Sequence, residues 1–409
     1  MPRVFVTDAS ERAALAVIRS LGNKGIEVTA GDSVSFNAGF LSKYCEHRIL
    51  YPSPERDRER FVKFLLDHVK ENKYDLLVPV TDFTAIPLSR HKDEFECYVR
   101  VAVPPFEVAV KAFDKARTVV IADEEGIRHP RTFMIEDLSQ VEEIAAEINY
   151  PAVIKPRMSI VWLGNRAVKL KVTPLNYTYG EADLVTGYTR VVAMLESLGI
   201  RGQLPIVQEY VQGDSYGVEA LIHDSKPVAL FMHRRLREYP ITGGASTLRE
   251  SAMNPEVMDL GVRLLKAMGW DGVAMVEFKI DRKTREPMLI EVNGRLWGSL
   301  PLAILAGVDF PFLLYKTIVD GEEFPEFDFR IGVKSRWLIP GDTLWLFSCI
   351  MRGRSALTSI KQFIESFTVP DDVMMASDPA PTLGALKTAF DLTLDVLAGR
   401  RSMFGEDLA

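Results

Sequence analysis

The chain has few cysteines and no long apolar run. The first argues against disulfide-rich and zinc-binding proteins, and the second against membrane-spanning ones. Its three cysteines, Cys45, Cys97 and Cys349, lie far apart among 409 residues and form no CxxC pair. They therefore suggest neither a disulfide framework nor a zinc site, and we expect reduced thiols in a cytoplasmic protein. No uninterrupted apolar run reaches about 18 residues, and the N-terminus lacks a signal-peptide layout, so we predict no transmembrane helix.

A surplus of basic residues is also missing. The 49 Lys and Arg residues are outnumbered by 56 Asp and Glu residues, which gives a net charge of −7. A nucleic-acid partner would normally require a basic surface, so we predict none. Low-complexity segments and internal repeats are absent too. The composition is that of an ordinary folded protein, and the length exceeds what one core supports, so several domains are expected.

Strand and helix patterns alternate in the first hundred residues. The expected strands and helices are Val4–Thr7, Glu11–Leu21, Gly25–Ala30, Arg60–Glu71, Asp75–Val80 and Val99–Val103. This alternation predicts parallel βαβ units in a doubly wound sheet. A dinucleotide-binding version is disfavoured because Thr7–Arg12 holds no glycine that would let pyrophosphate approach. Thr81 and Asp82 follow a buried strand, where ligands often bind, although an Asx turn or helix cap would explain them equally well.

Two α+β units and an apolar-rich helical segment follow. We predict domains at 1–110, 111–207, 208–320 and 321–409. In the last of them, Trp337, Trp345, Phe347 and Ile350 indicate helices. A packed subdomain or an oligomer contact, such as a homodimer interface, is favoured there. Contact with a membrane surface stays open, because basic residues follow the apolar run.

A hairpin pattern near residue 284 carries acidic residues on one face. The strands Val273–Ile280 and Pro287–Asn293 flank a polar turn. Side chains alternate along a strand. The residues then predicted to form the core face are Val276, Phe278, Ile280, Met288, Ile290 and Val292. Glu277, Glu291 and Asn293 fall on the opposite face.

The two glutamates are expected to face each other. Each lies seven residues from Thr284, so a hairpin symmetric about Thr284 pairs them. Facing residues have Cβ atoms about 5 Å apart, and like charges so placed are destabilising. A hard divalent cation bound by Glu277, Glu291 and the amide oxygen of Asn293 would offset the repulsion. A solvated outer face is the alternative. Gly294, which permits close backbone approach, and Arg295, a fork for phosphate oxygens, favour the cation site.

The run Glu291-Val-Asn-Gly-Arg295, preceded by Glu277, resembles the terminal motif of the ATP-grasp enzymes. The resemblance is to the branch of carbamoyl-phosphate synthase and biotin carboxylase, and within it to uncharacterised carboxylate–amine ligases. It covers about residues 1–320. It implies an α/β and α+β architecture, with a Rossmann-like pre-ATP-grasp domain before a two-subdomain ATP-grasp fold. The helical C-terminal extension lies outside the resemblance.

The resemblance assigns roles to matching positions. The metal ligands it implies, for two Mg²⁺ or Mn²⁺ ions, are Glu277, Glu291 and Asn293. The ATP-binding residues it implies are Lys115, Lys155, Glu209, Tyr210, Val211, Asp214 and Glu219. The residues it places near the transferred phosphoryl group and the substrate are Arg295, Arg234, Arg235 and His233. Lys155 also stands out by itself, because a lysine closing a buried apolar strand often has an anionic partner. A basic helix or loop surface is the alternative for residues 233–237.

One segment departs from the family pattern. Relatives have a flexible glycine-rich loop after the Lys-Pro strand, whereas Arg157–Arg166 contains one glycine, Gly164, and the bulky Trp162. The residues that could contact the phosphates instead are Ser159, Asn165 and Arg166. A stiffer loop is expected. The small-residue loop Thr242–Thr247 has amides that could bind an anion, or it serves only as a connector.

These features together predict an ATP- and Mg²⁺-dependent ligase. A small-molecule carboxylate would attack the γ-phosphate, and an amine or thiol would then displace phosphate from the acyl phosphate. Such chemistry depends on positioning and electrostatics. Two alternatives stay open: a carboxylase acting through carboxyphosphate, and an ATP-binding sensor or assembly subunit without turnover. No Met-Lys-Met biotin site is present, and the sequence does not identify the acid or the amine.

Overall fold

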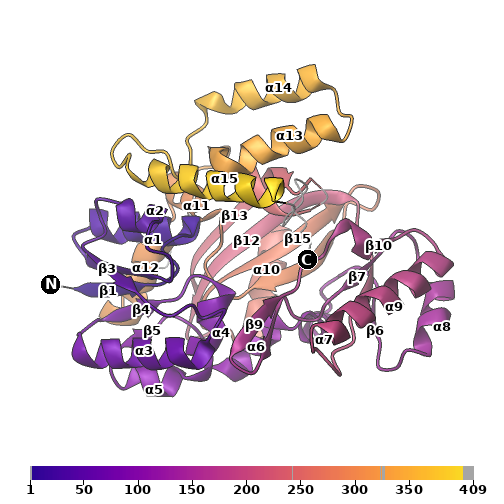
Figure 1. The fold of residues 1–409 in the computed structure, drawn as a ribbon, viewed down its shortest axis with the longest axis horizontal. Coiled ribbons are helices and arrows are strands. Elements are labelled where there is room, and N and C mark those ends of the chain that lie inside the picture. Colours follow the sequence, from indigo (N-terminus) through magenta and orange to yellow (C-terminus); the bar gives the residue numbers. More distant parts are fainter. Residues whose placement is uncertain (1, 242, 323, 325–327, 399–409) are drawn as a thin grey trace.

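Three main sheets, a two-stranded hairpin and a helical C-terminal segment are found among the described residues (Figure 1). The structure, a computed structural model, describes residues 2–241, 243–322, 324 and 328–398. Thr242, one end of the predicted anion-binding loop, and the last eleven residues of the predicted C-terminal extension lie outside the described residues.

The N-terminal sheet is parallel throughout, as predicted, with the strand order β3-β2-β1-β4-β5. Its strands are β1 (Arg3–Val6), β2 (Glu27–Asp32), β3 (His47–Leu50), β4 (Leu76–Val78) and β5 (Arg100–Val101). Its helices are α1 (Arg12–Asn23), α2 (Ala38–Leu41), α3 (Arg58–Glu71), α4 (Asp82–Arg90) and α5 (Lys92–Glu96). Val4 and Val6 pack into one core and Phe5 into another, so both faces of the sheet are covered. The sequence analysis missed β3, an edge strand that is mostly exposed and has no apolar pattern.

A small antiparallel sheet with the order β10-β7-β11-β6 follows two helices. Its strands are β6 (Thr132–Met134), β7 (Ala152–Lys155), β10 (Tyr177–Thr178) and β11 (Ile206–Glu209). The helices of this unit are α6 (Phe106–Phe113), α7 (Lys115–Glu124), α8 (Gln140–Glu147) and α9 (Glu181–Ser197), with a 3₁₀ turn η1 (Pro174–Asn176). Strands β8 (Ile160–Leu163) and β9 (Arg166–Lys169) form a separate hairpin. Residues of α8, α9, β7 and β11 form one core, so this unit is a separate subdomain.

The large sheet is antiparallel, with the order β16-β15-β12-β13-β14-β17. Its strands are β12 (Gly213–His223), β13 (Lys226–Tyr239), β14 (Ala245–Ser251), β15 (Gly272–Asp281), β16 (Pro287–Asn293) and β17 (Lys334–Arg336). Its helices are α10 (Pro255–Ala267), α11 (Leu300–Ala306) and α12 (Phe310–Tyr315), continued by a π-helical turn η2 (Lys316–Asp320). Val17 and Ile18 of α1 share one core with Leu300 and Phe310, so α11 and α12 join this sheet to the N-terminal domain.

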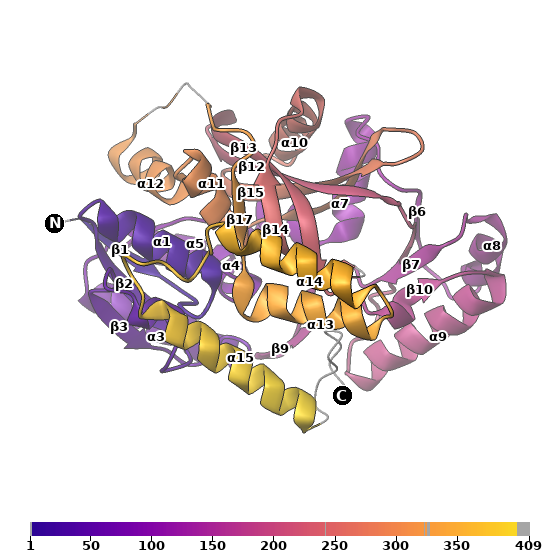
Figure 2. The same cartoon turned by 90° about the horizontal axis from the view of Figure 1, so that it is seen from above.

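The C-terminal segment is helical, as predicted, but it is also part of the large sheet. Its elements are η3 (Leu338–Asp342), α13 (Thr343–Met351), α14 (Ala356–Glu365), η4 (Ser366–Thr368) and α15 (Pro381–Leu397). Strand β17, from the same segment, pairs with β14. Figure 2 shows α13 and α14 side by side, with α15 running from the N-terminal domain past them. The described residues beyond 320 therefore add a strand to the large sheet and pack against the other domains.

Buried ion pairs join this segment to the other domains. Arg12 donates to Asp372 at 2.7 Å, and Arg249 of β14 is paired with the same carboxylate. Arg19 of α1 donates to Asp378 at 2.8 Å. Among the described residues no single helix is both long and apolar enough to cross a bilayer; α11 and α12 reach that composition only when counted together across a 92° bend.

Candidate functional site

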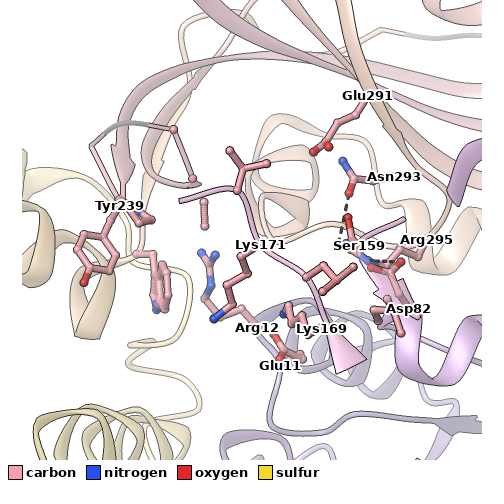
Figure 3. Close-up of a pocket in the computed structure, with 18 of the residues that line it drawn as sticks. Glu11, Arg12, Asp82, Ser159, Lys169, Lys171, Tyr239, Glu291, Asn293 and Arg295 are labelled. Carbon is pink, nitrogen blue, oxygen red and sulfur yellow. Dashed lines mark hydrogen bonds and ion pairs between the residues drawn. The ribbon is translucent and has the colours of Figure 1, made fainter. Parts of the chain in front are cut away.

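The hairpin β15–β16 sets two glutamates opposite each other. Its register pairs Glu277 with Glu291, which confirms the facing arrangement predicted from symmetry about Thr284. Both side chains line a cavity that also reaches Asn293 and Arg295. Glu291, Asn293 and Arg295 also line an adjoining larger cavity, and Figure 3 shows them following one another along one side of it. The four residues singled out from the hairpin pattern therefore lie together.

A β-bulge between Glu277 and Phe278 changes which residues of β16 face the core. Phe278 is buried as predicted, but it pairs with Leu289, which is 2% exposed, and Ile290 lines the cavity beside Glu291. The prediction that Met288 and Ile290 share the core face was wrong. A bulge sets two residues of one strand opposite one residue of the partner strand. The alternation of side chains between the two faces of the sheet therefore shifts by one residue beyond the bulge.

The two facing carboxylates have different surroundings. Glu277 is paired with Arg235 and accepts a hydrogen bond from Asn293 Nδ2 at 2.9 Å. Burial nevertheless raises the pKa of Glu277, and the charge of Glu291 raises it further. Burial also acts to raise the pKa of Glu291, but the nearby cations Lys115 and Lys155 outweigh it and hold that pKa below its usual range. Glu291 is therefore a stable anion among cations, and a divalent cation between the two glutamates would stabilise both as anions.

Arg295 connects the hairpin to the N-terminal domain. Its Nη2 donates to Asn293 Oδ1 at 3.3 Å, and its Nε donates to Oδ1 of Asp82, the first residue of α4, at 3.0 Å (Figure 3). Asp82 therefore does more than cap a helix or form a turn, the alternative that the sequence left open. Packing requires a glycine at position 294, because a Cβ there would collide with the ring of Trp270. The sequence analysis had explained this glycine by close approach of the backbone to a ligand.

Lys115 and Lys155 approach the same cavity from the small subdomain. Lys115, the first residue of α7, donates from Nζ to Ser159 Oγ at 3.0 Å. Lys155 ends β7 and donates to Gln208 Oε1 at 2.5 Å. Burial lowers the pKa of Lys155 to about 8, although Glu291 acts against this. Both amines line the cavity together with Glu291, so positive charge is gathered opposite the acidic hairpin.

Glu209, Tyr210 and Val211 lie at the other end of the cavity, where adenine binding was predicted. The backbone N–H of Tyr210 donates to the carbonyl of Pro151 at 2.9 Å, so this amide is already engaged. The carboxylate of Glu209 accepts from the backbone and the side chain of Asn149. These contacts leave the apolar surface of Val211 and the ring of Tyr210 to face the cavity.

Two of the predicted nucleotide contacts do not reach the cavity. Asp214 accepts from Arg282 Nη2 at 3.2 Å near the tip of the hairpin, and its neighbour Ser215 lines the cavity in its place. Glu219 is fully buried, 2.8 Å from His233 Nδ1, and accepts from Ser299 Oγ at 3.1 Å. Asp214 is exposed and Glu219 is fully buried, and neither lines the cavity.

The basic residues 233–237 belong to a strand, so the helix or loop considered from the sequence was wrong. Strand β13 continues to Tyr239, and alternation separates neighbouring side chains. Arg235 lines the cavity beside Glu277. Arg234 donates to Glu250 Oε2 at 2.9 Å outside the cavity, and His233 is fully buried against Glu219. Only Arg235 of the three predicted catalytic residues on β13 is brought to the site.

The cavity has two chambers that meet at the acidic hairpin. The smaller, of about 390 Å³, reaches Lys155 and residues 209–211. The larger, of about 800 Å³, reaches the N-terminal domain and the C-terminal segment. The charged and amide side chains that line both are Arg12, Lys115, Glu291, Asn293 and Arg295. Gly243 and Gly244, from the small-residue loop, also line both. The sequence analysis did not identify Arg12, because its place at the start of a helix has no local signal for a site.

Comparison with known proteins identifies the domain that carries this cavity. Residues 203–338 match the family model described as "ATP-grasp in the biosynthetic pathway with Ter operon". The chain contains an ATP-grasp domain. It is 22% identical over 235 residues to the carbamoyl phosphate synthase large chain of Pyrococcus furiosus, covering 56% of this chain and 20% of that one. It is 26% identical over 217 residues to the D-alanine–D-alanine ligase of Nitrosospira multiformis, covering 51% and 66%.

A solved structure has a similar fold over most of the chain. The biotin carboxylase domain of a Hydrogenobacter thermophilus 2-oxoglutarate carboxylase, bound to MgADP and bicarbonate, superposes with a TM-score of 0.63. Identity is 18%, and the match covers 81% of this chain and 73% of that one. The likeness confirms the predicted fold class. The chain spans only 20% and 66% of the two related sequences, so their activities do not transfer directly.

The β8–β9 hairpin covers most of the segment 157–166, which the sequence analysis predicted to depart from the family pattern. It is pinned to the N-terminal domain, because Arg58 N donates to the carbonyl of Asn165 at 2.9 Å and the Arg58 guanidinium lies 5.2 Å from the Trp162 ring centroid. Of the predicted phosphate contacts in this segment, Ser159 faces the cavity, whereas Arg166 is exposed. These two contacts attach the hairpin to the N-terminal domain. The stiffer loop stays a prediction.

The pKa of Lys155 predicts how the ATP-grasp site responds to pH. Below about pH 8 its amine is charged and would attract the phosphates of a nucleotide, and above that pH the charge is lost. If Lys155 binds phosphate, kcat/KM for ATP is expected to fall toward a roughly tenfold loss per pH unit above this pKa. Lys155→Arg, which stays charged, should remove this decline. An identical decline in the arginine variant would rule out Lys155 as the titrating group.

Proposed function

We propose that this chain is an ATP-dependent ligase that activates a carboxylic acid as an acyl phosphate and transfers the acyl group to an amine or a thiol. The observation that carries the proposal is the position of the Glu277–Glu291 pair. The pair lines the smaller chamber, with Lys115, Arg235 and Arg295 around it, and Glu291 also lines the larger chamber. Such an arrangement suits transfer of a phosphoryl group from a nucleotide in one chamber to an acceptor in the other.

The residues divide into metal and phosphate ligands. Facing carboxylates and an amide oxygen are hard donors, and the mutual repulsion of Glu277 and Glu291 fits a site for Mg²⁺. Glu277, Glu291 and Asn293 would hold the metal, which when bound neutralises charge on the phosphates. Lys155 and Lys115 would hold the phosphate chain from the side of the small subdomain. Arg295, oriented by Asp82, would stabilise the phosphoryl group in transfer.

The reaction proceeds in two steps. A carboxylate oxygen of the substrate attacks the γ-phosphorus of ATP, the bond from that phosphorus to the β-phosphate oxygen breaks, and ADP leaves. An amine nitrogen or a thiolate sulfur then attacks the acyl carbon, and phosphate leaves. Adenine would lie in the smaller chamber beside Tyr210 and Val211, while the acid enters the larger one. Asp214, Glu219, His233 and Arg234 have no part in these steps.

Two alternative functions receive different support. A chamber of about 800 Å³ is far larger than bicarbonate needs, which favours an organic acid over carboxylation through carboxyphosphate. The pinned β8–β9 hairpin favours the other alternative, an ATP-binding sensor or assembly subunit without turnover, because closure and release of this segment would be slow.

Release of ADP in the presence of hydroxylamine separates these functions. The purified chain with Mg-ATP and a panel of carboxylic acids is expected to release ADP only when an accepted acid is present. Hydroxylamine should convert the acyl phosphate into a hydroxamate in the same amount. ADP release with bicarbonate alone would indicate the carboxylase reaction. Tight Mg-ATP binding with no ADP release from any acid would contradict the ligase and support the sensor.

A further inference from the structure

The larger chamber has one apolar wall, built by the C-terminal segment. Every side chain that this segment contributes to the lining is apolar except Thr388. The wall includes Trp337, Ile339, Leu344, Val373, Ala385 and Leu392. These residues come from η3, α13, α15 and the loop before α15. The segment therefore brings an apolar surface to a site whose reacting groups are charged.

A charged strip adjoins this apolar wall. Glu11 and Arg12 from the start of α1, together with Lys169 and Lys171 from the end of the β8–β9 hairpin, form it. In Figure 3 these residues occupy the middle of the chamber, between Tyr239 on one side and the Glu291–Arg295 group on the other. The chamber thus leads from the phosphoryl-transfer residues, past a charged strip, to the apolar wall.

Arg12 marks the boundary between the two surfaces. Its guanidinium carbon lies 3.8 Å from the centroid of the Trp337 ring, and its Nη1 donates to Asp372 at 2.7 Å. Both partners belong to the C-terminal segment, which therefore fixes the side chain in place. Arg12 also lines both chambers, so its charge is available near the place where a substrate carboxylate must lie for phosphoryl transfer.

We propose that the larger chamber binds a carboxylic acid with an extended apolar body. Its carboxylate lies between Arg12 and Arg295, and its apolar body lies on the wall formed by α13, α15 and η3. The inference rests on the proposed ligase function and specifies its acid substrate. A short polar acid would leave the apolar wall in contact with water, whereas an apolar chain removes that wall from water and gains affinity with each methylene group.

A series of straight-chain carboxylic acids from acetate to decanoate tests the inference. With Mg-ATP and hydroxylamine, KM for the acid is expected to fall about fourfold for each added methylene until the wall is covered, with little change in kcat. Binding of the same acids with a non-hydrolysable ATP analogue, measured by calorimetry, should show the same dependence without turnover. An affinity independent of chain length would overturn the inference.

Two matched variants on α15 test whether the acid contacts the chamber-lining face of this helix. Leu392 lines the chamber, whereas Leu394 lies on the same helix outside the lining and is 43% exposed. Leu392→Ser is expected to raise KM and Kd for octanoate about tenfold, and Leu394→Ser to leave both unchanged. Equal effects of the two variants would overturn the inference. Chain-length-dependent binding without ADP release from any acid would support the chamber assignment and contradict the ligase function, so the two failures are distinct.

Discussion

Replacing Glu291 by glutamine is expected to reduce Mg-ATP-dependent ADP release by about 1,000-fold while the fold stays intact. The variant keeps the shape of the side chain but removes one of the two facing charges that we assign to the metal. It also leaves the surrounding cations Lys115, Lys155 and Arg295 without their common counter-ion. ATP should therefore still bind without metal, and added Mg²⁺ should no longer strengthen that binding.

Measuring ATP affinity with and without Mg²⁺ checks this expectation independently of turnover. Glu286→Gln is the control and should behave as the wild type in ATP and Mg²⁺ binding, because Glu286 lies in the turn of the same hairpin, outside the cavity, and pairs with Arg128. Thermal unfolding of both variants would exclude a loss of fold. Normal Mg²⁺-dependent turnover of the Glu291 variant would contradict the assignment of Glu291 as a metal ligand.

Replacing Asp372 by asparagine is expected to lower the free energy of unfolding by about 3–5 kcal/mol. The Asp372 side chain is fully buried and is shared by Arg12 and by Arg249, which is also fully buried. The substitution leaves Arg249 as a buried charge without its counter-ion, which costs far more than the loss of an exposed pair. The midpoint of urea unfolding should fall accordingly.

Asp391→Asn provides the matched control. Asp391 pairs with Lys387 one helical turn away on the exposed face of α15, and its loss should change stability by less than about 1 kcal/mol. Equal unfolding midpoints for the two variants would show that the buried pair does not stabilise the C-terminal segment.

The local part of the site was predictable from the sequence. Glu277, Glu291 and Asn293 lie on adjacent strands of one hairpin, so counting residues from Thr284 predicted that the glutamates face each other. Lys155 stood out because a buried strand rarely ends in a lysine. These predictions needed only the alternation of side chains along strands and a short connection between them.

Predictions that depended on the length or regularity of strands failed. The basic run 233–237 was expected to follow a strand, but β13 extends through it, so Arg235 reaches the cavity and Arg234 does not. Because of the bulge beside Glu277, Leu289 faces the core in place of Ile290, which had been predicted there. Strand ends and bulges are set by pairing with β12, β14 and β16, and such pairing is not visible in a single segment of sequence.

The sequence by itself determined the fold class, the acidic hairpin and the departure of the 157–166 loop from its family, because each depends on residues close together in the chain. Only the tertiary structure showed that Arg12 and Asp82 line the site and that Asp372 holds Arg12 in place. It also showed that residues beyond 320 form a strand of the large sheet and a wall of the larger chamber. These contacts join segments far apart in sequence, and packing of whole domains brings them together.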